Sequence, residues 1–406
     1  MKTMLLCPEL LARESGIQRM LRLYLKALCE IAGPDDRVDL VVLNDRELPA
    51  EKLARFSNDR LRLRVACGGS KAQFLWAAIQ ASPGVDRIVC GHLGQLIAAR
   101  LARLFNPRLD YFLVAHGIEV WKPYSALERL ALRRARRILC VSEFTRREMQ
   151  RQIDLPEGRF AVVPNALDPF FAEEADQGVG VRRTEDLGSG PNPSGTGVPP
   201  VGLSSDTDVS PVGSESSPDL GVAAVPRGPD PSPEILSVAR LDSREHYKGV
   251  DHLIEALPAV RQAVPGVRLR VVGSGDDLPR LMTLAEQCGM AEAVEFAGLV
   301  DDETLRDAYR DCAVFALPSH AEGFGIVFLE AMARGKPCLG ALAGAIPAII
   351  DPTSGALVDY GNIAQISARL VWMLHQPWDS AAIKARAAQF SYPAFKVRLQ
   401  QALSVG

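Results

Sequence analysis

The stretch VFALPSHAEGFGIVFLEAMARGKP, residues 314–337, reads as one strand, one turn and one helix. The apolar run VFALPS predicts a strand that ends near Ser319, because strands buried on both faces lack polar alternation. IVFLEAMARG predicts a helix that ends where Gly335 is followed by Pro337. The turn between them is residues 321–325. A strand that leads directly into a helix is the repeating unit of an α/β fold.

The same alternation of short apolar runs and longer amphipathic segments continues on both sides of this stretch. Helical patterns such as residues 17–31 and 93–105 lie between the predicted strands. The strands are predicted at 3–7, 38–43, 61–66, 87–91, 111–115, 137–141 and 160–163, and then at 234–241, 267–275, 293–300, 312–319 and 336–343. This order predicts an α/β protein whose two Rossmann-like βα domains face each other across a ligand-binding cleft.

One segment interrupts the alternation. Residues 173–233 are rich in Gly, Pro and Ser and carry no apolar period, so we expect a disordered linker or insertion there. The predicted domains are therefore 1–172 and 234–390.

Composition and charge limit the classes of function. The chain has 406 residues, of which 47% are hydrophobic, and its net charge of −3 argues against a nucleic-acid-binding protein. Residues 1–170 nevertheless hold 27 Lys and Arg against 19 Asp and Glu, a net charge of +8, which favours an acidic partner such as a membrane surface.

The cysteines and the apolar runs bear on the compartment. The eight cysteines form no Cys-x-x-Cys pair, so we expect buried free thiols in a reducing compartment. The chain holds no apolar run of the roughly 20 residues that a membrane-spanning helix needs. Together these features predict a cytoplasmic protein that could lie at the periphery of the membrane's inner face.

The turn at 321–325 has the composition of an anion-binding site. Amides at the start of a helix attract anions, and Gly323 and Gly325 would allow a phosphate to approach the backbone closely. Glu322 precedes the helix and Glu330 lies on it, and eight helical residues would span roughly 12 Å. A carboxylate at each end suits a sugar, a diphosphate and a ribose in line. The alternative is an acidic helix start and a half-buried glutamate.

A second stretch, SVARLDSREHYKGVDHL (237–253), supplies cations. Arg240 ends a predicted strand, and Lys248 precedes the next helix. Two cations over a helix start suit a diphosphate leaving group, although two solvated charges would have the same pattern.

Taken together, these motifs resemble a known family. VARL…YKG followed by EGFGIVFLEA, with LVAHGIEVW (113–121) and VVPNALD (162–168) upstream, is similar to the retaining, nucleotide-sugar-dependent glycosyltransferases of the GT-B fold, family 4. The resemblance covers nearly the whole chain outside 173–233. It implies transfer of a hexose-type sugar from a UDP- or GDP-linked donor to a hydroxyl acceptor, carbohydrate or lipid-linked, in cell-surface glycan or glycolipid synthesis.

The resemblance also implies roles for particular residues. Glu322 would contact hydroxyls of the donor sugar, Glu330 would contact the ribose, and His116 would lie against the sugar. The remaining implied donor contacts are backbone amides of Gly323, Phe324 and Gly325, the diphosphate-neutralising cations Arg240 and Lys248, and the first glycine loop at Gly16. A C-terminal helix at about 391–406 would pack back on the first domain.

The sequence departs from the family pattern at two places. Ser15-Gly16 stands where two glycines are frequent, and Pro347-Ala348 where Pro-Glu is frequent. Three alternatives stay open: a nucleotide-sugar epimerase, a phosphorylase, and a catalytically inactive sugar-nucleotide-binding protein.

Neither a cofactor nor a metal is expected besides the donor. The Asp-x-Asp at Asp206 and Asp208 lies in the predicted linker, and the six histidines lack ligand spacing. The arginine-rich stretch 129–152 is either a solvated helix face or a docking surface for an anionic membrane.

Overall fold

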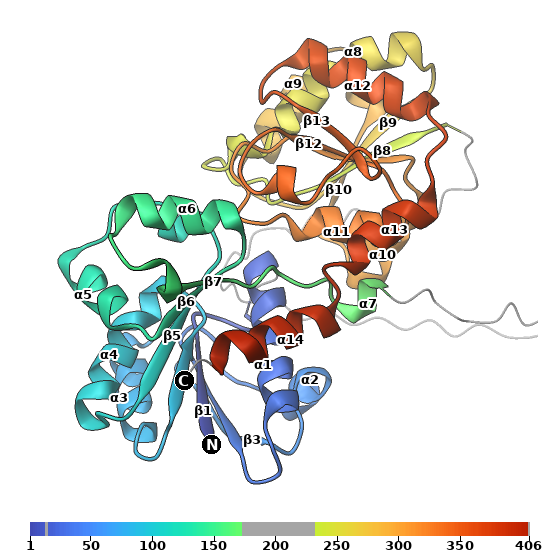
Figure 1. The fold of residues 1–406 in the computed structure, drawn as a ribbon. Helices are drawn as coiled ribbons and strands as arrows, with labels where there is room; N and C mark the ends of the chain where they lie inside the picture. The colour runs from blue at the N-terminus through green and yellow to red at the C-terminus, as the bar shows by residue number, and fades with distance from the viewer. Residues whose placement is uncertain (13–14, 173–231, 405–406) are drawn as a thin grey trace, which may run out of the picture. The chain divides into compact units, whose positions relative to one another are not determined.

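The computed structural model describes residues 1–12, 15–172 and 232–404. Most of the predicted linker at 173–233 lies outside these residues, as do Asp206 and Asp208. Two parallel sheets form within one compact unit of the chain (Figure 1). The predicted α/β fold class is therefore confirmed.

In the first sheet, the chain reverses its direction of strand addition beside β1. Seven strands pair in the spatial order β3-β2-β1-β4-β5-β6-β7. Their bounds are β1 (Lys2–Cys7), β2 (Arg37–Val42), β3 (Leu61–Ala66), β4 (Arg87–Cys90), β5 (Asp110–Ala115), β6 (Arg137–Cys140) and β7 (Phe160–Val162). The order switches between β1 and β4, and ligands of open α/β sheets bind beyond the carboxyl ends of the strands at such a switch.

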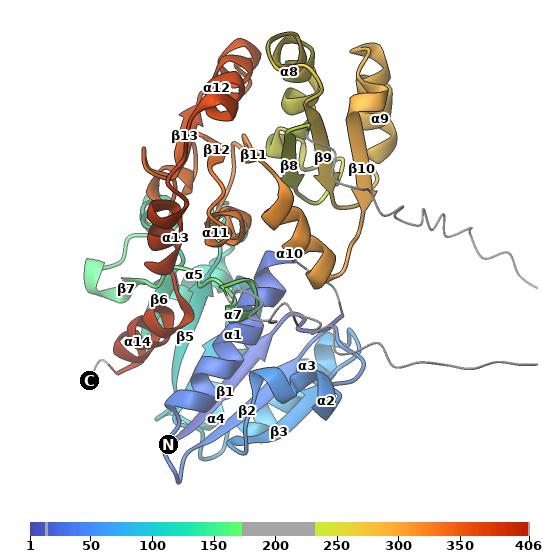
Figure 2. The ribbon, with the colours of Figure 1, turned by 90° about the vertical axis from the view of Figure 1, so that its right-hand side faces the viewer.

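Helices cover both faces of this sheet, and its central strands are therefore buried along their length. One face carries α3 (Lys71–Ala81), α4 (Leu96–Phe105), α5 (Ala126–Arg134) and α6 (Glu143–Gln152). The other face carries α1 (Gly16–Ile31), beside which the C-terminal helix α14 (Tyr392–Leu403) lies. The ring centroids of Tyr24 and Phe395 are 4.9 Å apart, and Lys396 Nζ lies 2.8 Å from Glu30 Oε2, so α14 contacts α1 directly (Figure 2).

The second sheet repeats this plan. Its six strands pair in the order β10-β9-β8-β11-β12-β13, again with a switch, here between β8 and β11. The strands are β8 (Glu234–Val238), β9 (Arg268–Val272), β10 (Val294–Gly298), β11 (Val314–Leu317), β12 (Cys338–Ala341) and β13 (Gly355–Val358). Its longer helices are α8 (Val250–Ala263), α9 (Leu278–Gln287), α10 (Asp302–Asp311), α11 (Ile326–Ala333), α12 (Ile363–His375) and α13 (Ser380–Ala388).

Short elements complete the described chain and place several site residues. They are the short helices α2 (Ala50–Leu53) and α7 (Pro169–Ala172), and the 3-10 turns η1 (Ala54–Phe56), η2 (Leu93–Gln95), η3 (Ile118–Val120), η4 (Glu157–Arg159), η5 (His246–Lys248), η6 (Ala291–Ala293) and η7 (Ile346–Ala348). The turns η3 and η5 follow β5 and β8, so they lie at the carboxyl ends of those strands.

Candidate functional site

Lys248 and Glu322 form a close ion pair at the carboxyl end of the second sheet. Lys248 Nζ donates to Glu322 Oε1 over 2.6 Å, although the residues are 74 positions apart. Lys248 ends η5, which follows β8, and Glu322 follows β11. Because β8 and β11 are neighbours at the switch of this sheet, the fold brings both charges to one place.

Glu330 lies deeper and has two partners. Its side chain is 2% exposed, Oε1 accepts from Arg19 Nη1 over 2.8 Å, and Oε2 accepts from the hydroxyl of Tyr309 over 2.8 Å. Arg19 stands on α1 of the first sheet and also donates to Asp302 over 2.7 Å. Each carboxylate oxygen of Glu330 can still accept one further hydrogen bond, since each has two lone pairs.

The turn before α11 depends on glycine. Gly325 is the N-cap of α11 with φ 92°, a conformation that strains any residue with a side chain. The helix therefore begins only at Ile326. The helical rise per residue, which the sequence led us to expect over the whole span from Glu322 to Glu330, holds only for the second half of that span. The side chain of Phe324 is buried, with its ring centroid 5.6 Å from that of Phe390, so only the backbone of Phe324 is available in the turn.

Gly323 lies directly against the backbone that follows β5. A Cβ added at Gly323 would lie 2.0 Å from the carbonyl oxygen of His116 and 2.9 Å from Cα of Gly117. The hydroxyl of Ser142 donates to the carbonyl of Gly323 over 2.8 Å. The glycine turn of the second sheet therefore lies beside two loops of the first.

His116 is buried and neutral. Its Nε2 lies 2.9 Å from the carbonyl oxygen of Gly91, which can only accept, so Nε2 carries the proton. Burial lowers the pKa of His116 to about 4 from its ordinary 6.5, opposed in part by the bond to Gly91. The Nδ1 atom is buried and has no hydrogen-bond partner among the described residues. In this tautomer Nδ1 carries a lone pair and can act only as a hydrogen-bond acceptor.

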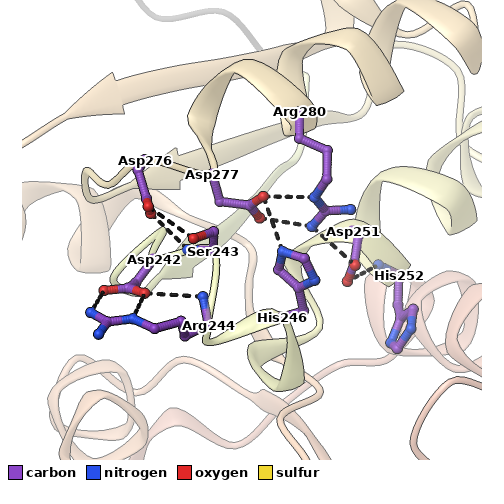
Figure 3. Close-up of polar contacts among 9 residues, drawn as sticks. All are labelled: Asp242, Ser243, Arg244, His246, Asp251, His252, Asp276, Asp277 and Arg280. Atoms are coloured by element: carbon purple, nitrogen blue, oxygen red, sulfur yellow. Dashed lines mark hydrogen bonds and ion pairs between the residues drawn. The ribbon is translucent and has the colours of Figure 1, made fainter.

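A polar network fixes the loop that carries Lys248 (Figure 3). Asp277 accepts from Arg280 Nε over 2.6 Å and contacts His246 Nε2 at 3.1 Å. The bond from Arg280 lowers the pKa of the Asp277 carboxyl. Ser243 donates its backbone N–H and its hydroxyl to Asp276 over 2.7 and 2.8 Å. These bonds tie the loop after β8 to the start of α9.

The structure brings together most, but not all, of the predicted site residues. Lys248 meets Glu322, and His116 meets Gly323. Gly16 lies beside the start of α11, since a Cβ there would be 3.7 Å from Ile326 Cδ1. Arg240 instead points to its own loop, where its guanidinium donates to Glu245, and its side chain is 61% exposed.

Sequence reasoning missed Arg19 and Tyr309, which contact Glu330, and Ser142, which contacts Gly323. Arg19 lies three residues after Gly16 on a helix that is otherwise largely buried. A cation in that position could have indicated from the sequence that Arg19 is a site residue. Tyr309 and Ser142 are ordinary helix and cap residues in the sequence, and only the fold places them near Glu330 and Gly323.

The arginine-rich stretch 129–152 is divided between α5, the buried strand β6 and α6. On α6, Arg146 pairs with Glu143 and Glu157, and Arg151 pairs with Glu148. Most of the positive charge of α6 is thus offset locally.

No helix in the described part of the chain is long and apolar enough to cross a membrane. No group of three His, Cys, Asp or Glu side chains is placed to hold a metal ion within 1–12, 15–172 and 232–404. Seven of the eight cysteines are buried, as expected, and Cys288 is half-buried.

Comparison with known proteins gives matches to both halves of the chain. Residues 15–170 match the family Glycosyltransferase Family 4, and residues 224–390 match Glycosyl transferases group 1. The D-inositol 3-phosphate glycosyltransferase of Segniliparus rotundus is 36% identical over 176 residues, which are 41% of this chain and 39% of that protein. The GDP-mannose-dependent alpha-(1-6)-phosphatidylinositol monomannoside mannosyltransferase of Mycobacterium tuberculosis is 36% identical over 143 residues, 33% of this chain and 36% of that protein.

The chain thus matches well under half the length of these curated relatives. A structural comparison extends over both sheets. The crystal structure of Anabaena HepE in complex with UDP and glucose has a TM-score of 0.70, covering 100% of this chain and 99% of that one at 19% identity. At this identity the likeness concerns the fold.

Proposed function

The chain belongs to the glycosyltransferases of group 1 and family 4, and from this premise we propose that it moves a hexose-type sugar from a nucleotide-diphosphate donor to a hydroxyl acceptor. The family membership confirms the resemblance that the motifs indicate. Within the proposal, the donor is UDP- or GDP-linked, the transfer retains the anomeric configuration, and no metal is needed. The acceptor is a carbohydrate or a lipid carrying a hydroxyl, as expected in glycan or glycolipid synthesis.

The observation that carries the proposal is the pairing of Lys248 with Glu322 beside the glycine turn that meets His116. Without a donor, the cation and the carboxylate neutralise each other. A nucleotide sugar would give each a new partner, with hydroxyls for Glu322 and phosphate oxygens for Lys248. The amides of residues 323–325 add donors at the start of α11, where anions are favoured.

The proposed reaction needs positioning and charge neutralisation more than it needs a protein nucleophile. The bond from the sugar C1 to the leaving phosphate oxygen breaks, and the acceptor oxygen bonds to C1 on the same face. The departing diphosphate takes the acceptor's proton. Lys248 would stabilise the developing negative charge, with Arg240 turning inward to assist it. Neutral His116 would accept a hydrogen bond from a sugar hydroxyl at Nδ1.

A glycosidase-like pair is a poor description of Glu322 and Glu330. Retaining hydrolases place two carboxyls about 5 Å apart across one bond. Here Glu322 is held by Lys248 and Glu330 by Arg19 and Tyr309. The two carboxylates have separate partners and suit two separate parts of a donor.

The test is release of nucleotide from a panel of UDP- and GDP-sugars, with EDTA present, for the wild type and for Glu322→Gln. We expect slow hydrolysis of one donor by the wild type, and a loss of at least about 100-fold in the variant, as for removal of a transition-state contact. The matched control is Glu286→Gln, an exposed glutamate on α9, which should leave the rate unchanged.

Binding of the same panel, read as thermal stabilisation, separates the remaining possibilities. Stabilisation by one donor without turnover, even with candidate acceptors added, would favour an inactive binding protein. Conversion of one sugar nucleotide to another without acceptor would favour an epimerase. If no donor in the panel either stabilised the protein or was turned over, the proposal would be overturned.

A further inference from the structure

The outer surface of α3, α4 and α5 exposes six large apolar side chains. We call it the α3–α5 face and define it by Trp76, Ile97, Leu104, Phe105, Leu127 and Leu130. Trp76 is 64% exposed, Phe105 68% and Leu127 63%. Isolated exposed apolar residues need no explanation, but a group of them on adjacent helices marks an interaction surface.

The three helices lie side by side along one side of the first sheet (Figure 1). Their inner faces already fill the core, with Phe74 from α3, Leu96 from α4 and Leu132 from α5. On α4, Ile97 and Leu104 are seven residues apart and share the outer side. On α5, Leu127 and Leu130 are three apart and do the same. The α3–α5 face is therefore a second apolar surface that the core does not use.

Cations are interspersed with these apolar side chains. The three described helices carry six of them, Lys71, Arg100, Arg103, Arg129, Arg133 and Arg134. Against these, α5 contributes one acid, Glu128, which is bound in the capping box with Ser125. The carboxylate of Asp110, at the start of β5, lies 3.7 Å from Arg103 and 3.9 Å from Arg136. The face keeps a clear excess of positive charge.

From this combination we propose that the α3–α5 face docks on an anionic lipid bilayer. Trp and Leu enter the boundary between headgroups and acyl chains, while Lys and Arg reach anionic headgroups with their stems along the apolar surface. The assignment refines the basic stretch 129–152. The arginines of α5 belong to the docking face, and those of α6 do not, because they pair with Glu143, Glu148 and Glu157.

A second copy of the chain fits the α3–α5 face less well than an anionic membrane does. In a two-fold contact the same patch meets itself, so six cations would face six others with few acids between them. An anionic membrane supplies the missing charge.

The position of the face suits the proposed function, on which this further step rests. Ile118, 46% exposed, follows His116 by two residues, and α5 begins soon after at Ala126. A bilayer against Leu127 would thus lie beside the loop that leads from His116. A hydroxyl on a lipid-linked acceptor would then be presented near the carboxyl end of β5. The docking itself needs neither donor nor acceptor, so it is measured independently of turnover.

The test is co-sedimentation of the full chain with vesicles of phosphatidylcholine alone or with 30% phosphatidylglycerol. We expect binding to the anionic vesicles that weakens with salt and is at least fivefold weaker for Leu127→Asp/Leu130→Asp. The control is Met282→Asp, an exposed apolar residue on α9, which should bind like the wild type. Leu127, Leu130 and Met282 are all exposed, and circular dichroism would verify that each variant keeps the fold.

A second measurement locates the contact. Brominated lipids should quench tryptophan fluorescence in the wild type and in Trp372→Phe, but much less in Trp76→Phe. Absence of binding to anionic vesicles at low salt, or quenching that persists in Trp76→Phe, would overturn the proposal. So would a dimer in light scattering that the Leu127→Asp/Leu130→Asp variant dissociates, because the occupant would then be a second copy.

Discussion

Arg19 Nη1 lies 2.8 Å from Glu330 Oε1, and this contact joins α1 of the first sheet to α11, the helix that follows the glycine turn of the second sheet. The two residues are 311 positions apart in the chain. Glu330 is almost fully buried, Arg19 is 16% exposed, and the guanidinium lies 4.9 Å from the ring centroid of Phe171. Arg19 therefore supplies the countercharge for a carboxylate that the proposed function assigns to the donor ribose.

Arg19→Ala should destabilise the protein and weaken donor binding together. Removing one partner of a buried ion pair leaves an uncompensated charge and costs about 3–5 kcal/mol. Since Tyr309 still donates to Glu330, we expect the lower end, roughly 3 kcal/mol in urea unfolding. Donor KM should rise because Glu330 loses its fixed orientation.

The matched control for this prediction is Arg244→Ala. Arg244 pairs with Asp242 at 2.8 Å, but its side chain is 87% exposed, so no measurable change in stability is expected. Equal stabilities of Arg19→Ala and the wild type would show that the contact to Glu330 contributes nothing.

His116 should make stability depend on pH below neutrality. The folded protein keeps the imidazole neutral down to a pKa of about 4, because it is buried, whereas the unfolded chain takes up a proton near pH 6.5. The stabilising contribution is therefore complete above pH 6.5 and is lost as the pH falls towards 4. Between pH 7 and pH 5 the loss should be roughly 2 kcal/mol.

Urea unfolding at both pH values, for the wild type and His116→Asn, measures this difference. The variant should lose roughly 2 kcal/mol less than the wild type, because its side chain does not titrate. Parallel losses in the two proteins would mean that His116 is protonated in the folded state.

Gly323→Ala should disturb the meeting of the two sheets. The new Cβ would lie 2.0 Å from the carbonyl oxygen of His116, so the turn or the loop after β5 must move. We expect a loss of about 1–3 kcal/mol in stability, as for overpacking, and at least tenfold in kcat/KM for donor hydrolysis. Gly158→Ala is the control, since a Cβ there meets nothing within 4 Å. Unchanged kinetics in Gly323→Ala would show that the contact between Gly323 and the loop after β5 does not affect turnover.

The sequence predicted most of the strands because buried parallel strands are continuous apolar runs. The expected strands 3–7 and 61–66 correspond to β1 and β3 within one residue. Bounds were less accurate in the second sheet, where 267–275 became β9 (Arg268–Val272), since the strand ends before Gly273, whose φ is 140°. The strand β13 was missed because GALV offers two small residues and no long apolar run.

The candidate site was predictable in its residue types and less so in its contacts. The glycine turn and the cation before α8 are local patterns, and the fold joins Lys248 to Glu322. The direction of Arg240 towards Glu245 could not be predicted, because the two lie in one loop whose shape depends on α9. The partners of Glu330 come from two other helices, so no local pattern contains them.

Asp277→Asn tests whether the network of Figure 3 holds Lys248 in place. Asp277 is buried, and its carboxylate accepts two bonds from Arg280, over 2.6 and 2.7 Å, besides the contact to His246. Loss of these charge-assisted bonds should cost roughly 2 kcal/mol. Because His246 begins the turn that Lys248 ends, kcat for donor hydrolysis should fall about tenfold, as expected when a charged group is misplaced.

Asp242→Asn, in the same loop, is the control. It distinguishes the specific misplacement of Lys248 from a nonspecific loss of order in the loop after β8. The Asp242 carboxylate accepts from the backbone N–H and the guanidinium of Arg244, whose side chain is exposed, so turnover should be unchanged. If both variants lowered kcat equally, the loop as a whole would matter and Asp277 would have no special part. If Asp277→Asn lost stability but kept its kcat, the network would serve the fold of the second sheet without positioning Lys248.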